Sequence, residues 1–223
     1  MSRRAVILGA TGLIGGALLR TLLQQSQWQQ LTLVGRRHPD IEADPRIRLV
    51  TASLDDLDQH KTEFAVDDVF CCLGTTLRQA GSKAAFERVD KTFCVHAAQQ
   101  AAAAGAKRFI MVSAVNANRH GISFYARTKG EAEREVIAAG VPMTAFMQPS
   151  LLQGHRAEFR LGEEIGLKTL ALVMPLARWT RADWLPIEAQ TVANAMVAVA
   201  LQGPDTGIHR LRYQQMSQYA ESL

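Results

Sequence analysis

The chain has 223 residues, of which 48% are hydrophobic and 21% charged, so it can bury one substantial apolar core. Its formal net charge is +4, but the basic residues are scattered among acidic ones instead of forming a basic stripe, which argues against a nucleic-acid partner. We therefore expect a single domain over residues 1–223.

Cysteine and histidine usage excludes two further classes of protein. The three cysteines are an odd number, two of them adjacent, which does not suggest a disulfide framework. The histidines are not clustered with cysteines or carboxylates at ligand spacing, so no metal site is expected. Glycines interrupt the apolar start of the chain, and no uncharged stretch reaches membrane-spanning length. These features predict a cytoplasmic protein without a membrane partner.

Apolar runs of strand length alternate with helical patterns along most of the chain. Strands are expected at 5–10, 31–35, 47–51, 68–74, 108–114, 144–148 and 207–213, and helices at 13–24, 84–104, 125–139, 189–201 and the C-terminus. Because the strands are apolar on both faces, the pattern predicts an α/β fold, a Rossmann-type doubly wound parallel sheet.

The alternation breaks down after Pro149, and residues 151–187 are interpreted as a substrate-pocket insert that belongs to a small C-terminal region. Its large apolar side chains could line a pocket, although an ordinary small core is an equally open interpretation. These side chains are Phe159, Met174, Trp179 and Trp184.

The segment GATGLIG at 9–15 follows the first strand and opens the first helix, as a dinucleotide-binding loop does. Gly9 would allow the tight turn, Gly12 would let the backbone approach a pyrophosphate, and Gly15 would let helix and strand pack closely. The helix N-terminus supplies N–H donors to the anion. The other predicted cofactor contacts of this segment are Thr11, Leu13 and Ile14.

Arg36 and Arg37 follow the second strand, and no acidic residue comes before Asp40. An acid at this place typically binds the ribose 2′-hydroxyl of NAD, whereas arginine accommodates the 2′-phosphate of NADP. The pair favours NADP(H) as cofactor, with an exposed basic loop as the alternative.

Tyr125 and Lys129 are four residues apart in the segment YARTK, so a helix places them on one face. A nearby ammonium favours the phenolate, which makes Tyr125 a candidate proton donor to a carbonyl group, while Lys129 could also hold the nicotinamide ribose. Ser113, at the end of the preceding strand, would hydrogen-bond the same carbonyl. Each residue alone has an ordinary structural interpretation, and the hypothesis depends on their order along the chain.

These residues resemble the short-chain dehydrogenase/reductase superfamily and its atypical branch. The segments FCCLGTT at 70–76, FERVD at 86–90 and YARTKGEAE at 125–133 are similar to the Tat-interacting oxidoreductase family and its bacterial relatives. The resemblance implies a Rossmann domain, NADPH and a catalytic set of Ser113, Tyr125 and Lys129. It also implies cofactor contacts from Leu73, Gly74 and Thr75 beside the adenosine and ribose, and from Pro149, Ser150 and Leu151 near the nicotinamide.

Two positions depart from the superfamily pattern. The place after the third strand that commonly holds an adenine-binding Asp has Ser53, followed by Leu54, which we keep as predicted cofactor contacts. The Asn that relays protons in typical members has no evident counterpart, and Asp90 is the nearest polar candidate.

The expected function is NADPH-dependent reduction of a small carbonyl compound by a monomer or homodimer. The alternative is a dinucleotide-bound sensor or scaffold with little or no turnover. Fold similarity does not separate the two, because function depends on the site.

Overall fold

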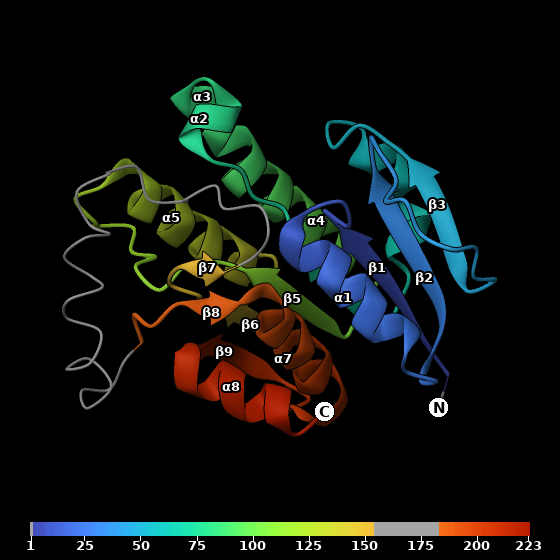
Figure 1. Cartoon of the computed structure of the whole chain (residues 1–223). Coiled ribbons are helices and arrows are strands. Elements are labelled where there is room, and N and C mark those ends of the chain that lie inside the picture. Colours follow the sequence, from blue (N-terminus) through green and yellow to red (C-terminus); the bar gives the residue numbers. More distant parts are fainter. Residues whose placement is uncertain (1, 154–182) are drawn as a thin grey trace.

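Seven parallel strands form the central sheet of the computed structural model, which describes residues 2–153 and 183–223 (Figure 1). Their order in the sheet is β3-β2-β1-β4-β5-β6-β9. The strands are β1 (Arg3–Leu8), β2 (Trp28–Gly35), β3 (Ile47–Thr51), β4 (Asp68–Cys71), β5 (Arg108–Val112), β6 (Met143–Met147) and β9 (Gly207–Leu211). Every pairing between them is parallel, which confirms the predicted Rossmann-type doubly wound fold.

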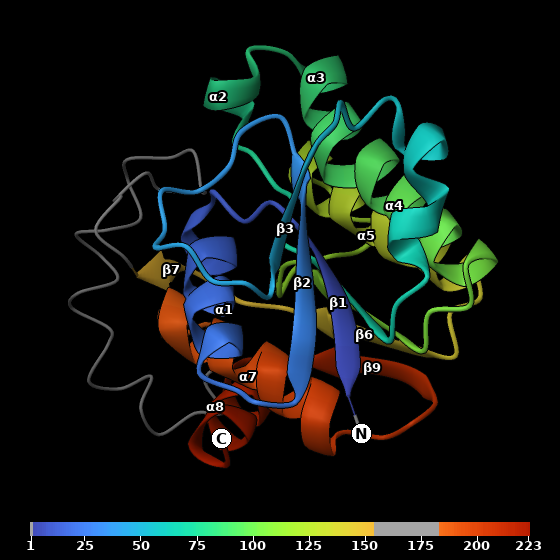
Figure 2. The same ribbon diagram turned by 90° about the vertical axis from the view of Figure 1, so that its right-hand side faces the viewer.

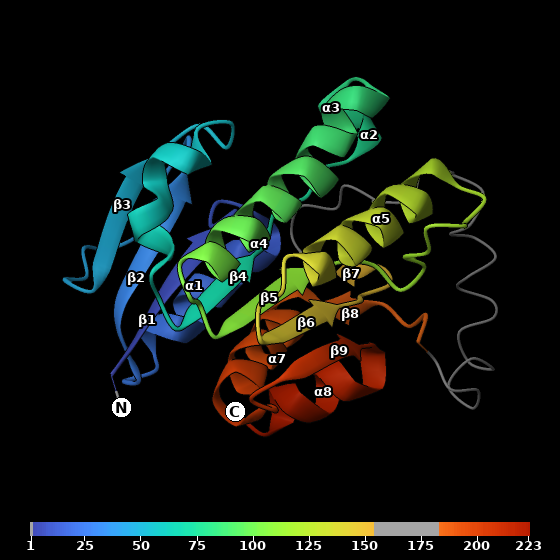
Figure 3. The ribbon, with the colours of Figure 1, turned by 180° about the vertical axis from the view of Figure 1, so that it is seen from behind.

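Helices cover both faces of this sheet, as the doubly apolar strands require (Figures 2 and 3). Within β1, Ala5 and Ile7 join the core under α1 (Leu13–Leu23) and α7 (Ala189–Gln202). Val6 and Leu8 join the opposite core, under η1 (Leu57–Phe64), α4 (Phe93–Ala103) and α5 (Phe124–Ala138). Helix α8 (Tyr213–Glu221) packs on α7. The alternating directions of the β1 side chains therefore build two separate cores.

The strand order reverses at β1, which lies between β2 and β4. The chain leaves β1 toward α1 on one face, whereas the chain after β4 leads to α4 on the other face. In open parallel sheets, ligands bind outside the carboxyl ends of the strands at such a point. The loops that carry the predicted cofactor contacts therefore meet at this edge.

The helix predicted over 84–104 is present, but it is not a regular α-helix throughout. It consists of α3 (Lys83–Glu87), the π-helical segment η2 (Arg88–Thr92) and α4, which run into one another. The short helix α2 (Leu77–Ala80) and the 3-10 helix η1 were not predicted. The strands expected at 68–74 and 108–114 end earlier, at Cys71 and Val112, because the chain turns there into the loops of the site.

The predicted insert over 151–187 lies mostly outside the described residues, and so do Phe159, Met174 and Trp179. At its two ends, β7 (Leu152–Gln153) pairs in parallel with β8 (Ile187–Glu188). Trp184, which lies within the described residues, is 62% exposed. Among the described residues, no helix is long and apolar enough to cross a membrane.

Candidate cofactor and active site

The glycine turn after β1 has the close backbone contacts that a dinucleotide loop needs. Gly9 has a φ angle of +83°, and a Cβ there would lie 2.7 Å from the carbonyl oxygen of Cys72. A Cβ on Gly15 would lie 2.1 Å from the carbonyl oxygen of Gly9, so helix α1 approaches the turn too closely for any side chain. These two glycines are therefore required by packing.

Gly12 faces a less crowded space. Among the described residues, a Cβ on Gly12 would come within 4 Å of a single heavy atom, the Gly9 carbonyl oxygen at 3.2 Å. Gly12 is also the N-cap of α1, without a side-chain hydrogen bond to the helix and without an acidic residue in the first turn. The first N–H groups of α1 are thus available to an anion, and the cradle fits a pyrophosphate group.

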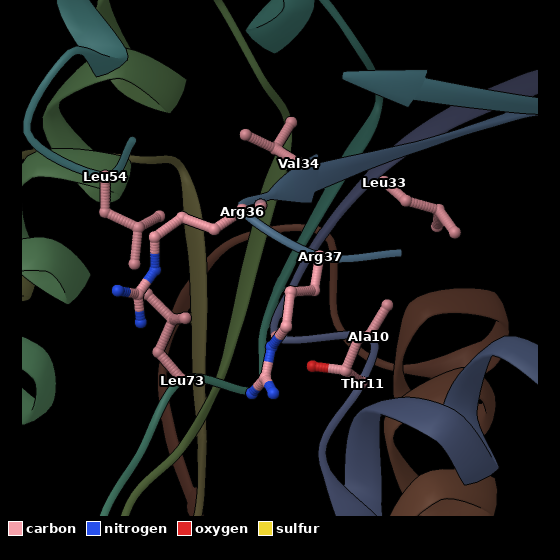
Figure 4. Close-up of a pocket in the computed structure, with 10 residues that line it drawn as sticks. Ala10, Thr11, Leu33, Val34, Arg36, Arg37, Leu54 and Leu73 are labelled. Carbon is pink, nitrogen blue, oxygen red and sulfur yellow. The ribbon is translucent and has the colours of Figure 1, made fainter. Parts of the chain in front are cut away.

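A pocket opens beside this turn (Figure 4). The exposed side chains of Arg36 and Arg37 extend over it from the end of β2, and Leu54 and Leu73 provide apolar walls. Two guanidinium groups beside an apolar wall suit a ligand with a phosphate and a flat ring. The lining residues are Gly9, Ala10, Thr11, Leu33, Val34, Gly35, Arg36, Arg37, Leu54 and Leu73.

The structure thus brings together predicted contacts from four separate segments, and places others next to this lining. Leu13 and Ile14 direct their side chains into the core from the first turn of α1. Ser53, beside Leu54, donates a hydrogen bond of 3.2 Å to the Asp55 carboxylate instead of lining the pocket. Gly74 and Thr75 follow Leu73 in the loop after β4.

Tyr125 and Lys129 lie one turn apart on α5, as predicted from their spacing. Tyr125 is partly buried against the ring of Phe86, with ring centroids 5.7 Å apart. Lys129 is 1% exposed, and its Nζ atom lies 2.7 Å from Oδ1 of Asp90, which is also 1% exposed. The second oxygen of Asp90 accepts a hydrogen bond of 2.8 Å from the backbone amide of Thr75. The carboxylate therefore connects the loop after β4 with helix α5.

The charge of Lys129 is favoured despite its burial. Desolvation is the largest single influence and by itself would lower the pKa of this ammonium, but the combined effects of the Asp90 carboxylate, Tyr125 and Cys94 outweigh it, and Asp90 contributes most among the three. The pKa of Lys129 is consequently raised above its ordinary value. A buried, permanently charged lysine beside a tyrosine can stabilise negative charge on the phenol oxygen.

Ser113 is buried at the end of β5, where its hydroxyl donates a hydrogen bond of 2.6 Å to Oε1 of Glu133. The same oxygen accepts a bond of 2.8 Å from Nε2 of Gln148, and Oε2 accepts one of 2.8 Å from Nε of Arg210. The donor hydrogen of Ser113 is thus used within the protein. Ser113 would have to release Glu133 in order to donate to a substrate, and its catalytic role stays a prediction.

The segment after β6 lies against the segment after β5. The amide of Val115 donates to the carbonyl oxygen of Pro149 at 3.1 Å. Ser150 donates from its hydroxyl to the carbonyl oxygen of Leu185, and Leu151 accepts from the amide of Ile187 at 2.8 Å. Residues 149–151 are therefore held at the same edge of the sheet as the residues after β5.

Glu133 was not predicted from the sequence, and Asp90 was named there without its contact to Lys129. Tyr125, Lys129 and Glu133 follow one another at steps of four residues, so one face of α5 carries three polar side chains, two of them buried. That repeat was a usable signal for Glu133. Among residues 2–153 and 183–223, no cluster of three or more His, Cys, Asp and Glu side chains could hold a metal ion.

The sequence matches the family model described as NAD(P)H-binding over residues 9–174. It is 34% identical to Protein HTATIP2 of Rattus norvegicus over 199 residues, which cover 88% of this chain and 80% of that protein. It is 30% identical over 208 residues to Protein FMP52, mitochondrial, of Candida albicans, covering 88% of this chain and 87% of the relative. The recognised resemblance to Tat-interacting proteins is thereby confirmed.

Solved structures share the fold at low sequence identity. The UDP-Glc/GlcNAc 4-epimerase of Campylobacter jejuni superposes with a TM-score of 0.71 at 13% identity, covering 96% of this chain and 82% of that chain. The Bordetella bronchiseptica enzyme WbmG, solved in complex with NAD, superposes with a TM-score of 0.68 at 14% identity, covering 95% and 73%. At this identity the likeness shows the fold alone.

One expectation from the sequence is wrong on these comparisons. A cytoplasmic location was expected, whereas several fungal relatives are named mitochondrial, among them those of Scheffersomyces stipitis, Candida albicans and Lodderomyces elongisporus. The expectation was based on cysteine usage and on the lack of a membrane-spanning stretch, and these features do not distinguish the cytoplasm from the interior of an organelle.

Proposed function

We propose a function for this chain on the premise that it belongs to the NAD(P)H-binding family, whose model matches residues 9–174. The family relation and the fold support an oxidoreductase-like protein that binds a nicotinamide dinucleotide. The proposed reaction is NADPH-dependent reduction of a small carbonyl compound. The observation that carries the proposal is the buried, charged Lys129 one helical turn from Tyr125, on a helix tied through Asp90 to the loop after β4.

In this proposal the bound cofactor supplies a hydride to the carbonyl carbon. The Tyr125 hydroxyl donates its proton to the carbonyl oxygen, which gives the alcohol, and the phenol later regains a proton from solvent. The Lys129 ammonium stabilises the negative charge that develops on the phenol oxygen and holds the nicotinamide ribose. The Ser113 hydroxyl, directly after β5, donates to Glu133 and would add only a weak hydrogen bond to the carbonyl, when it releases that carboxylate.

The preference for NADP(H) is proposed from the end of β2. Arg36 and Arg37 line one pocket with the glycine turn, at the place where a 2′-phosphate would lie. No carboxylate follows β2 before Asp40, so an acid that could bind a ribose 2′-hydroxyl is missing from this turn. Two guanidinium groups provide charge-assisted hydrogen bonds to a phosphate.

A second candidate, a dinucleotide-bound sensor or scaffold, is favoured by the hydrogen bond between Ser113 and Glu133. That bond uses the donor hydrogen that a substrate carbonyl would need. A protein that binds the dinucleotide but lacks this donor would turn over slowly.

A survey of cofactor oxidation distinguishes the two candidates. The purified protein is incubated with NADPH and a panel of aldehydes, ketones and quinones, and the loss of NADPH absorbance is followed. The proposed reductase oxidises NADPH in a saturable manner with at least one compound, and the Tyr125→Phe variant does not. Tight NADPH binding without turnover across the whole panel would instead support the sensor.

A further inference from the structure

The ion pair between Asp90 and Lys129 joins three parts of the site. Asp90 lies in η2, between α3 and α4, while Lys129 lies on α5 and Thr75 lies in the loop after β4. One oxygen of the Asp90 carboxylate is 2.7 Å from the Lys129 ammonium, and the other accepts the Thr75 amide at 2.8 Å. Both oxygens of this buried side chain are therefore engaged.

We propose that Asp90 is a positioning residue of the reductase site: its carboxylate keeps the Lys129 ammonium charged and fixes it against the backbone of the loop after β4. The catalytic meaning of this inference rests on the proposed function, whereas the charge on Lys129 is measurable without it.

Burial is the reason why Lys129 needs this partner. A lysine removed from water loses its proton easily, because desolvation disfavours the charged form. In this chain the Asp90 carboxylate is the largest influence that opposes desolvation, and together with Tyr125 and Cys94 it raises the pKa of Lys129. Without the carboxylate, desolvation alone would remain as the dominant influence, and the ammonium would lose its proton at lower pH.

The other titratable groups around Lys129 do not replace Asp90. Tyr125 precedes it by one turn on α5, and Cys94 faces it from α4. The thiol of Cys94 has a pKa raised well above its usual range, first by its hydrogen bond with Cys71 of β4 and then by burial, so it carries no charge near neutral pH. Among the described residues, Asp90 is thus the carboxylate that contacts the ammonium.

A second ion pair joins the same two elements on the outside of the molecule. Lys91 Nζ lies 2.8 Å from Oε2 of Glu131, and their side chains are 22% and 33% exposed. Lys91 directly follows Asp90 in η2, and Glu131 lies two residues after Lys129 in α5. The hydrogen bond with Glu131 raises the pKa of Lys91, but solvent screens this pair. Glu131 therefore provides a matched control for Asp90.

The π-helical segment explains how Asp90 reaches this place. A π turn contains one more residue than an α turn, which rotates the residues before it by about 100° relative to those after it. Within η2, Asp90 is buried while Lys91 is partly exposed. Such single π turns occur frequently at functional sites. The irregularity therefore places one acidic side chain inside, against α5.

The test is a direct titration of Lys129 in the substrate-free protein. The side-chain carbons of lysine are labelled with ¹³C, and chemical shifts are followed against pH in the unmodified protein, in Asp90→Asn and in Glu131→Gln. A Lys129→Met variant assigns the signal. In the unmodified protein Lys129 should keep its proton beyond about pH 10.4, the ordinary lysine value. In Asp90→Asn the same signal should titrate at least about one pH unit lower.

Glu131→Gln should leave the Lys129 titration unchanged and lower that of Lys91. Lys129 titrating below the ordinary lysine value in the unmodified protein would overturn the inference, even if Asp90→Asn does not fold. The inference would also be overturned if Lys129 titrated at the same pH in Asp90→Asn as in the unmodified protein. The same holds if Glu131→Gln shifted the Lys129 titration as far as Asp90→Asn does.

The failure of the reductase proposal would look different. Where a substrate is known, Asp90→Asn should move the alkaline limit of NADPH-dependent reduction to lower pH, since reduction requires charged Lys129. If the Lys129 titration shifts in Asp90→Asn but no substrate is turned over, the reductase proposal is contradicted. The inference that Asp90 keeps Lys129 charged then still holds. Normal turnover with an unshifted titration contradicts the inference alone.

Discussion

The Ser113 hydroxyl donates its hydrogen to the Glu133 carboxylate at 2.6 Å, and both side chains are buried. Ser113→Ala removes this bond and leaves one buried carboxylate oxygen with fewer donors, which costs about 1–3 kcal/mol of unfolding free energy. Because the donor is already used inside the protein, turnover should fall by less than about tenfold. Chemical denaturation and steady-state kinetics measure the two effects.

Ser123→Ala provides the control for Ser113→Ala. Ser123 caps α5 by accepting the amide of Ala126 at 3.1 Å, and its loss should cost about 1 kcal/mol without changing turnover. If Ser113→Ala lowered turnover a hundredfold or more at unchanged stability, Ser113 would act directly on the substrate and its bond to Glu133 would be a resting arrangement.

The architecture could be predicted from the sequence because the patterns that indicate it are local. Doubly apolar strands, a glycine turn and the spacing of Tyr125 and Lys129 each depend on a few adjacent residues, and the structure has all of them in place. The π-helical segment was not predictable, because residues 84–104 have continuous helical periodicity. The partner of Asp90 depends on how α5 packs against η2, which involves residues 39 positions away in the chain.

Arg36 and Arg37 should determine the preference for NADPH over NADH. The double variant Arg36→Ala/Arg37→Ala removes both guanidinium groups from the pocket and should weaken NADPH binding by about two to four orders of magnitude, since hydrogen bonds to charged groups contribute about 1.5–3 kcal/mol each. NADH binding should change little. Fluorescence titration with both cofactors measures this.

The matched control is Arg20→Ala, which removes an exposed arginine from the last turn of α1, at the end of the helix away from the glycine turn. It should leave both affinities unchanged. Equal affinities for NADPH and NADH in the unmodified protein would refute the assignment of the pocket to a 2′-phosphate.

The glycines of the turn should respond differently to substitution. Gly12→Val should keep the fold, because the backbone there has a φ of −80° and the space around a Cβ is open apart from the Gly9 carbonyl oxygen. Its branched side chain would occupy the approach of the pyrophosphate, so cofactor binding should be lost. Calorimetry, with circular dichroism as the check on folding, measures this.

Gly15→Ala, in contrast to Gly12→Val, should affect the stability of the fold first. Its Cβ would lie 2.1 Å from the Gly9 carbonyl oxygen, so α1 must move and the melting temperature should fall clearly. A Gly12→Val protein that still binds the dinucleotide would mean that the turn serves only to pack α1 against β1.

The buried ion pair predicts a non-additive effect on stability. Lys129→Met removes the ammonium and leaves the Asp90 carboxylate buried without its counter-ion, which should cost about 3–5 kcal/mol. Adding Asp90→Asn to Lys129→Met removes the uncompensated charge and should recover most of that loss. Urea denaturation of the unmodified protein, the two single variants and the double variant gives the unfolding free energies for a double-mutant cycle. A double variant no more stable than Lys129→Met would mean that the two side chains do not interact as an ion pair.

The last prediction concerns the proton donor. Tyr125→Phe keeps the ring that packs against Phe86, so the fold and NADPH affinity should be preserved. It removes the phenol hydroxyl, and turnover of a carbonyl substrate should fall by about two to four orders of magnitude, the usual contribution of a general acid. Phe86→Leu is the control, because it alters the same aromatic contact while leaving the hydroxyl in place, and it should change turnover far less. NADPH affinity comes from fluorescence titration and turnover from NADPH absorbance. A Tyr125→Phe protein that reduces its substrate at the unmodified rate would show that the proton comes from another group, since only the hydroxyl distinguishes the two side chains.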